Sequence, residues 1–120
     1  MQKKYLIVLL ADSSTHENMG RALHALLYAK QLKTHGLEVE LIFDGGGTEW
    51  AAKFPTHEHF KKLYGELVTD GVIKGVCSFC AAAFHVEDEL KALGANFISE
   101  DGDHPDIGGR IANGETLITI

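Results

Sequence analysis

Apolar residues along the chain gather in five short runs, each of a length that suits a buried β-strand. The runs cover residues 5–11, 38–43, 72–77, 95–98 and 116–120. Several of them are continuous rather than alternating with polar residues. This is typical of strands that are buried on both faces of a parallel sheet.

Between these runs, apolar residues recur at the spacing of amphipathic helices. Ser14 and Glu17 match the S-x-x-E pattern of a capping box, so the first helix is expected to begin after Ser14. Later helices are expected in three places: after Pro55, over 80–93 with a break near His85, and over 107–112.

A glycine stands between the end of each expected helix and the next strand, at Gly36, Gly71, Gly94 and Gly114. Helices commonly end on a residue in the left-handed conformation, which glycine adopts at least cost. The alternation of strands and helices predicts helical crossovers and therefore parallel strands. We therefore predict an α/β fold: a three-layer α/β/α sandwich with a five-stranded, mainly parallel sheet, formed as a single domain over residues 1–120.

The composition excludes some classes of partner. The chain has 120 residues and a net charge of −6 at pH 7, and its lysines and arginines are scattered. Nucleic acid and anionic membranes are therefore not expected as partners. The apolar run near the N-terminus is too short to span a bilayer and ends without a convincing cleavage site. We expect a cytoplasmic protein, whose thiols stay reduced.

In such folds, functional sites lie beyond the carboxyl ends of the strands. The loops expected there are ADSSTHE, DGGGTEW, CSFC and SEDGDHPD. They supply the candidate site residues Asp12, Ser13, Ser14, His16, Asp44, Cys77, Cys80, Asp101, Asp103 and His104. The glycines of DGGGTEW predict a flexible turn, because the segment matches neither a Walker motif nor a dinucleotide fingerprint.

Cys77 and Cys80 are the only cysteines. Cys80 is expected where a helix begins, and there the backbone N–H groups would lower the pKa of its thiol and make it a nucleophile. Cys77, at the end of a strand, is expected to be buried. Two alternatives stay open: both cysteines pack as small apolar residues, or they bind a metal that His16 and His104 help to hold. We expect no metal and no cofactor.

Three segments together resemble the DsrE/DsrF-like family: KYLIVLLADSS, ALHALLYAKQLKTHGLEVELIFDGGG and GVIKGVCSFCAAAFHV. The resemblance implies a small α/β protein of the kind found in cytoplasmic sulfur relays. It places the persulfide-carrying cysteine of the relay members at Cys80, and Cys77 matches a second cysteine that only some members have. It also implies an assembly such as a trimer or a hexamer, either a homo-oligomer or a heteromer with similar subunits, and a sulfur donor or acceptor protein as partner.

The leading hypothesis is a sulfur carrier or sulfurtransferase-like protein that takes up sulfane sulfur as a persulfide on Cys80, with Cys77 as the resolving thiol. The candidate pocket residues are Asp12, Ser14, His16, Asp44, Asp101 and His104, of which the two histidines are candidates for proton transfer. The alternative is a non-enzymatic, oligomeric module that binds a small ligand or a metal, with the cysteines lining its pocket. A thioredoxin-like dithiol exchanger is disfavoured, since neither Pro55 nor Pro105 directly precedes a strand.

Overall fold

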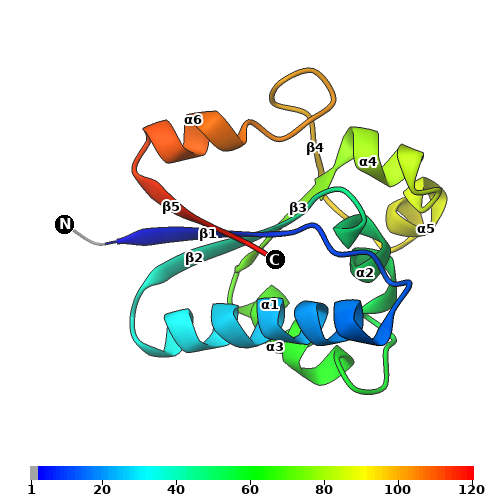
Figure 1. The fold of residues 1–120 in the computed structure, drawn as a ribbon, viewed down its shortest axis with the longest axis horizontal. Helices are drawn as coiled ribbons and strands as arrows, with labels where there is room; N and C mark the ends of the chain where they lie inside the picture. The colour runs from blue at the N-terminus through cyan, green and yellow to red at the C-terminus, as the bar shows by residue number, and fades with distance from the viewer. Residues whose placement is uncertain (1–2) are drawn as a thin grey trace.

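The computed structural model describes residues 3–120, which form a five-stranded sheet flanked by helices (Figure 1). The strands are β1 (Lys4–Leu9), β2 (Glu38–Phe43), β3 (Ile73–Cys77), β4 (Phe97–Ile98) and β5 (Glu115–Thr119). They lie in the order β4-β3-β2-β1-β5, and every neighbouring pair is parallel. The predicted α/β fold with a five-stranded sheet is confirmed.

Residues 3–120 form six helices: α1 (His16–Thr34), α2 (Gly47–Lys53), α3 (Lys61–Thr69), α4 (Ser78–Ala83), α5 (Glu87–Ala92) and α6 (Ile107–Ala112). The expected break near His85 is confirmed, since this residue separates α4 from α5 with a φ of 60°. The four return glycines all have positive φ, between 74° and 98°. The expected left-handed helix ends are therefore present.

The start of α1 differs from the prediction by one residue. Thr15 is the N-cap, and its side chain accepts a hydrogen bond from the Asn18 N–H at 3.1 Å. Ser14 instead donates its hydroxyl to Asp12 Oδ1 at 2.6 Å. The capping-box prediction was wrong because the carboxylate of Asp12, two residues earlier, binds the serine.

The glycine run after β2 forms a turn at Gly45 and Gly46, as expected, and its third glycine, Gly47, begins α2. A side chain at Gly47 would overlap the backbone carbonyl of Leu9, and one at Gly46 would lie 2.5 Å from Asp12 Cβ. The chain can therefore turn from β2 into a helix against the end of β1 only because these two positions lack a side chain.

Side chains of each strand alternate between the two faces of the sheet, and the two faces are covered unequally. Ile7 and Leu9 belong to the larger core, together with buried residues from α1 to α5. Leu6 and Val8 belong to a small cluster on the opposite face, which Ile107 of α6 covers. In Figure 1, α1 and α3 lie on one side of the sheet and α6 on the other. The three layers are therefore present, with one thick and one thin helical layer.

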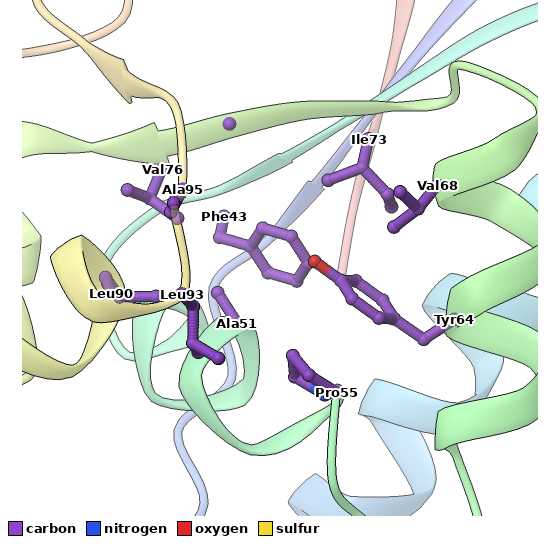
Figure 2. A pocket seen from close by; sticks show the side chains of 12 residues that line it. Phe43, Ala51, Pro55, Tyr64, Val68, Ile73, Val76, Leu90, Leu93 and Ala95 are labelled. Carbon is purple, nitrogen blue, oxygen red and sulfur yellow. The ribbon is translucent and has the colours of Figure 1, made fainter.

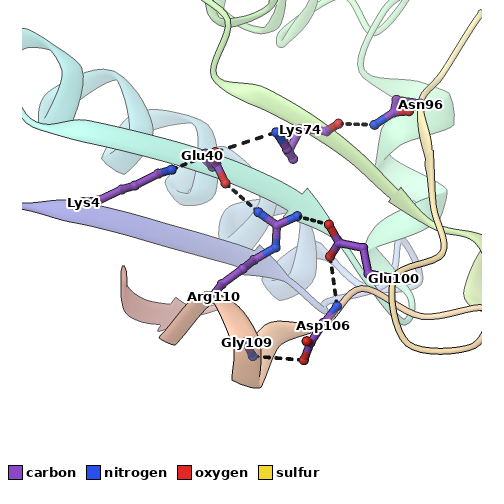
Figure 3. Close-up of polar contacts among 8 residues, drawn as sticks. All are labelled: Lys4, Glu40, Lys74, Asn96, Glu100, Asp106, Gly109 and Arg110. Carbon is purple, nitrogen blue, oxygen red and sulfur yellow. Dashed lines mark hydrogen bonds and ion pairs between the residues drawn. The ribbon is translucent and has the colours of Figure 1, made fainter. Parts of the chain in front are cut away.

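Ion pairs attach α6 to the thin face (Figure 3). The Arg110 guanidinium donates to Glu40 of β2 and to Glu100, both at 2.8 Å, and its side chain is only 12% exposed. Glu100 also accepts the backbone N–H of Asp106 at 3.0 Å. This bond and Arg110 lower the pKa of the Glu100 carboxyl. These contacts fix both ends of the loop between β4 and α6, which carries His104.

Among residues 3–120, no helix combines the length and the apolar character needed to cross a bilayer.

Candidate functional site

The turn between β3 and α4 carries both cysteines. Cys77 is the last residue of β3 and also the N-cap of α4, and its Sγ accepts a hydrogen bond from the Cys80 N–H at 3.4 Å. The helix begins at Ser78, two residues earlier than predicted. Cys80 therefore lies in the first turn of the helix, and its own N–H is occupied by the other cysteine.

Three neighbouring strands deliver reactive side chains to this turn. Asp44 directly follows β2, Cys77 ends β3 with Cys80 three residues later, and His104 lies in the loop after β4. The Cys80 thiol donates to Asp44 Oδ1 at 3.3 Å, and Cys77 Sγ lies 3.5 Å from His104 Nδ1. The sulfurs of both cysteines and a ring nitrogen of His104 all lie within 4.8 Å of one another. We call these four residues the cysteine cluster.

A tight backbone pairing places His104 beside Cys77. The backbones of Asp101 and His104 form an antiparallel bridge, with N–O distances of 2.9 Å and 3.2 Å, around a turn at Gly102 that has a φ of 61°. The loop is also tied to α4, because the Phe79 N–H donates to the Asp103 carbonyl at 2.9 Å. Asp101 and Asp103 thus contribute through their backbones.

Phe79 is a part of the site that the sequence reasoning missed. Its ring lies 4.8 Å from the His104 ring, measured between centroids, and its side chain is 52% exposed. A large aromatic residue between two cysteines at the start of a helix was the available signal. Its contact with the imidazole limits the orientations that His104 can adopt.

The two thiols differ in burial. Cys77 is fully buried, as expected, and this burial raises its pKa to about 12. Cys80 is partly exposed, and its pKa is also raised, by burial and then by the hydrogen bond and the negative charge of Asp44. The predicted lowering of the Cys80 pKa was wrong, because burial first of all, and then the carboxylate of Asp44, favour the protonated thiol.

A second polar group, which we call the Asp12 loop (residues 12–16), lies after β1. Asp12 Oδ1 accepts hydrogen bonds from the N–H and the hydroxyl of Ser14 and from the Asn18 amide, at 2.6–3.0 Å. These bonds lower the pKa of Asp12. The Asp12 carbonyl accepts the Trp50 indole N–H at 2.9 Å, so the loop is fastened to α2.

His16 lines a shallow depression of about 340 Å³ on this side, together with Ser14, Trp50, Lys53 and His57. The structure thus divides the predicted site residues into two groups. It brings Asp44, Cys77, Cys80 and His104 together, and it places Asp12, Ser14 and His16 in the other loop.

A separate cavity of about 310 Å³ opens between α3 and α5 on the thick side of the sheet (Figure 2). Its walls are apolar and include the rings of Phe43 and Tyr64, which lie next to each other with their centroids 6.4 Å apart. Burial raises the pKa of the Tyr64 hydroxyl. None of the twelve residues that line this cavity is a predicted site residue.

The protein is therefore a small, parallel α/β/α sandwich that carries a thiol at the turn after its third strand. The chain belongs to the DsrE/DsrF-like family, whose model matches residues 3–120.

The chain is similar to two individual proteins, one in sequence and one in fold. Over 74 residues it is 38% identical to an uncharacterized protein of Methanocaldococcus jannaschii, a match that covers 62% of this chain and 60% of that protein. The fold is shared with a conserved protein of unknown function from Bacteroides thetaiotaomicron, with a TM-score of 0.62 and 19% identity over 96% of this chain and 94% of that one. At this identity the second likeness shows the fold alone.

Proposed function

We propose that the protein is a cytoplasmic sulfur carrier or sulfurtransferase-like protein that takes up sulfane sulfur as a persulfide on Cys80. The observation that carries this proposal is the asymmetry of the cysteine pair, with one partly exposed thiol beside a fully buried one. Membership of the DsrE/DsrF-like family supports a role of the sulfur-relay kind.

In the loading step, Cys80 Sγ attacks the outer sulfur of a donor persulfide. The S–S bond of the donor breaks, a new S–S bond forms on Cys80, and the proton of the Cys80 thiol ends on the departing donor thiol. No net oxidation occurs, because one thiol and one persulfide exchange places. Cys80 suits this step since its sulfur is the one that an incoming donor reaches.

Two routes unload the persulfide. An acceptor thiol attacks the outer sulfur, which regenerates the Cys80 thiol. Alternatively, Cys77 attacks Cys80 Sγ, a disulfide forms between the two cysteines, and hydrosulfide leaves. In that second route the outer sulfur is reduced and the two cysteines are oxidised, so an external thiol reductant must restore the pair. The short distance between the sulfurs supports this route.

Asp44 and His104 control the protonation of the pair in this proposal. Asp44 holds the resting Cys80 as a thiol by accepting its hydrogen bond. His104 Nδ1 lies 3.5 Å from Cys77 Sγ and is placed to take the proton of the buried thiol in the second route. His16, in the other depression, is not used.

The test compares the two cysteines one at a time. Each variant is reduced, exposed to inorganic polysulfide, freed of excess reagent and weighed intact. Cys80→Ser is expected to take up no sulfur, whereas Cys77→Ser is expected to retain one sulfur atom and to release sulfide more slowly than the parent protein. Circular dichroism confirms that both variants are folded. Loading of Cys80→Ser to the parent level would refute the proposal.

We also propose that the protein works as a homo-oligomer, a trimer or a hexamer, and exchanges sulfur with a partner protein. The exposed Phe79 ring, beside His104, gives apolar surface on which a donor or acceptor protein can dock. Light scattering after size-exclusion chromatography is expected to give three or six times the mass of the chain. A monomeric mass at all concentrations would contradict this part.

A further inference from the structure

We propose that the cysteine cluster is also a zinc site, in which Cys77, Cys80 and His104 bind the ion and water takes the fourth position, while Asp44 stays beside Cys80 as a neighbour of the site. This inference goes beyond the proposed function and does not depend on it. The site follows from geometry: two sulfurs and an imidazole nitrogen, from two different loops, lie within 4.8 Å of one another.

The measured distances fit the size of the ion. Zinc lies about 2.3 Å from thiolate sulfur and about 2.0–2.1 Å from imidazole nitrogen, so a tetrahedral site places sulfur and nitrogen about 3.5 Å apart. Cys77 Sγ and His104 Nδ1 are 3.5 Å apart, which matches that separation. Since no pair among the sulfurs and the ring nitrogen exceeds 4.8 Å, small side-chain rotations suffice to close the site around an ion.

The chemistry of the donors selects the metal. Two thiolates and an imidazole favour zinc over magnesium or calcium, which prefer oxygen ligands. On binding, the two thiols release their protons to solvent and form two zinc–sulfur bonds, and no group is oxidised or reduced. The two thiolates carry enough negative charge to balance the ion.

The surroundings hold the ligands in place. The backbone N–H of Cys80 donates to Cys77 Sγ. The Phe79 ring and the backbone bridge to Asp101 fix His104. Such supporting contacts orient metal ligands before the ion arrives, which raises affinity.

Zinc and sulfur loading then exclude each other. The lone pair that Cys80 uses to attack a sulfur donor is the one that it gives to the metal. A protein with zinc bound would therefore take up no sulfur on Cys80, and removal of the zinc by a chelator would restore sulfur uptake.

The test uses the whole chain, reduced and freed of metal. Zinc is titrated against a chromophoric chelator, and cobalt(II) in place of zinc reports the ligands through sulfur-to-metal charge-transfer and tetrahedral d–d absorption bands. One ion per chain is expected, with affinity at least about tenfold weaker in His104→Ala. His16→Ala, a histidine of the other loop, is expected to bind as the parent does. Circular dichroism shows whether each variant is folded.

Absence of stoichiometric zinc binding, or equal binding by His104→Ala and the parent protein, would overturn the zinc site. Sulfur loading is measured separately on metal-free protein, so its result stands whatever the metal titration gives. If the metal-free parent takes up sulfur but binds no zinc, only the zinc site fails. If it binds zinc but takes up no sulfur, only the proposed function fails.

Discussion

The cysteine cluster and the Asp12 loop lie at the same edge of the sheet and contain similar residue types, yet their polar groups are used differently. In the Asp12 loop, one carboxylate oxygen accepts three hydrogen bonds from its own segment. In the cysteine cluster, the Cys80 thiol donates a hydrogen bond to Asp44 but stays partly exposed. A position at this edge of the sheet is therefore not enough to make a reactive site. The side chain must also remain accessible, and its polar atoms must not all be used in hydrogen bonds within the fold.

The turn after β2 separates the two groups. Asp44 faces the cysteines, whereas Gly46, two residues later, packs against Asp12. The close approach of Gly47 to Leu9 fixes the turn between them. The substitutions below are therefore compared between the two groups, or with a substitution at a position where the added side chain meets no neighbour.

Gly47→Ala is expected to have the largest effect, because its side chain would collide with the Leu9 carbonyl, which also accepts the Asp44 N–H at 3.0 Å. We expect a loss of about 3 kcal/mol or more in the free energy of unfolding, measured in urea. Gly20→Ala is the control, since nothing lies within 4 Å of its added carbon on α1. It is expected to gain about 1 kcal/mol. Equal stability of Gly47→Ala and the parent would show that the two groups are not fixed by this turn.

Asp44→Asn is expected to make Cys80 alkylate several-fold faster at neutral pH. The charge and hydrogen bond of Asp44 both raise the pKa of this thiol, so their removal lowers the pKa and increases the reactive thiolate. The rate of iodoacetamide labelling, followed against pH, should shift to lower pH. Asp12→Asn should leave the profile unchanged. A shift to higher pH in Asp44→Asn would mean that the carboxylate activates the thiol instead.

The smallest expected effect is on acid stability. Hydrogen bonds from Ser14 and Asn18 lower the pKa of Asp12 in the folded protein. The stability that they contribute is present above the unfolded pKa of about 3.9 and is lost as the pH falls through the folded value. In Asp12→Asn this increment is absent at every pH, so its melting temperature should fall less between about pH 5 and pH 2 than that of the parent. Parallel melting curves would show that Asp12 does not hold the loop.

Much of the fold could be predicted because local patterns determine it. The apolar runs located all five strands, and the glycines that end helices have the left-handed backbone that was expected of them. His85 was correctly placed at a break between helices. Each of these features depends on residues close together in the sequence.

The rest depends on contacts that no local pattern reveals. The role of Gly47 depends on the carbonyl of Leu9, in another strand. The pKa of Cys80 is raised by burial under the folded chain and then by Asp44, 36 residues earlier, and neither cause is visible in the local sequence. His16 and His104 looked equivalent in the sequence, but only His104 lies with the cysteines.

Persulfide formation on Cys80 is best tested by locating the added sulfur in the parent protein. Reduced protein is exposed to polysulfide, its thiols and persulfides are capped with an alkylating reagent, and the peptide that spans residues 75–84 is fragmented between its two cysteines. We expect one extra sulfur atom on Cys80, and a reductant should remove it. An extra sulfur on Cys77, or on neither cysteine, would contradict it.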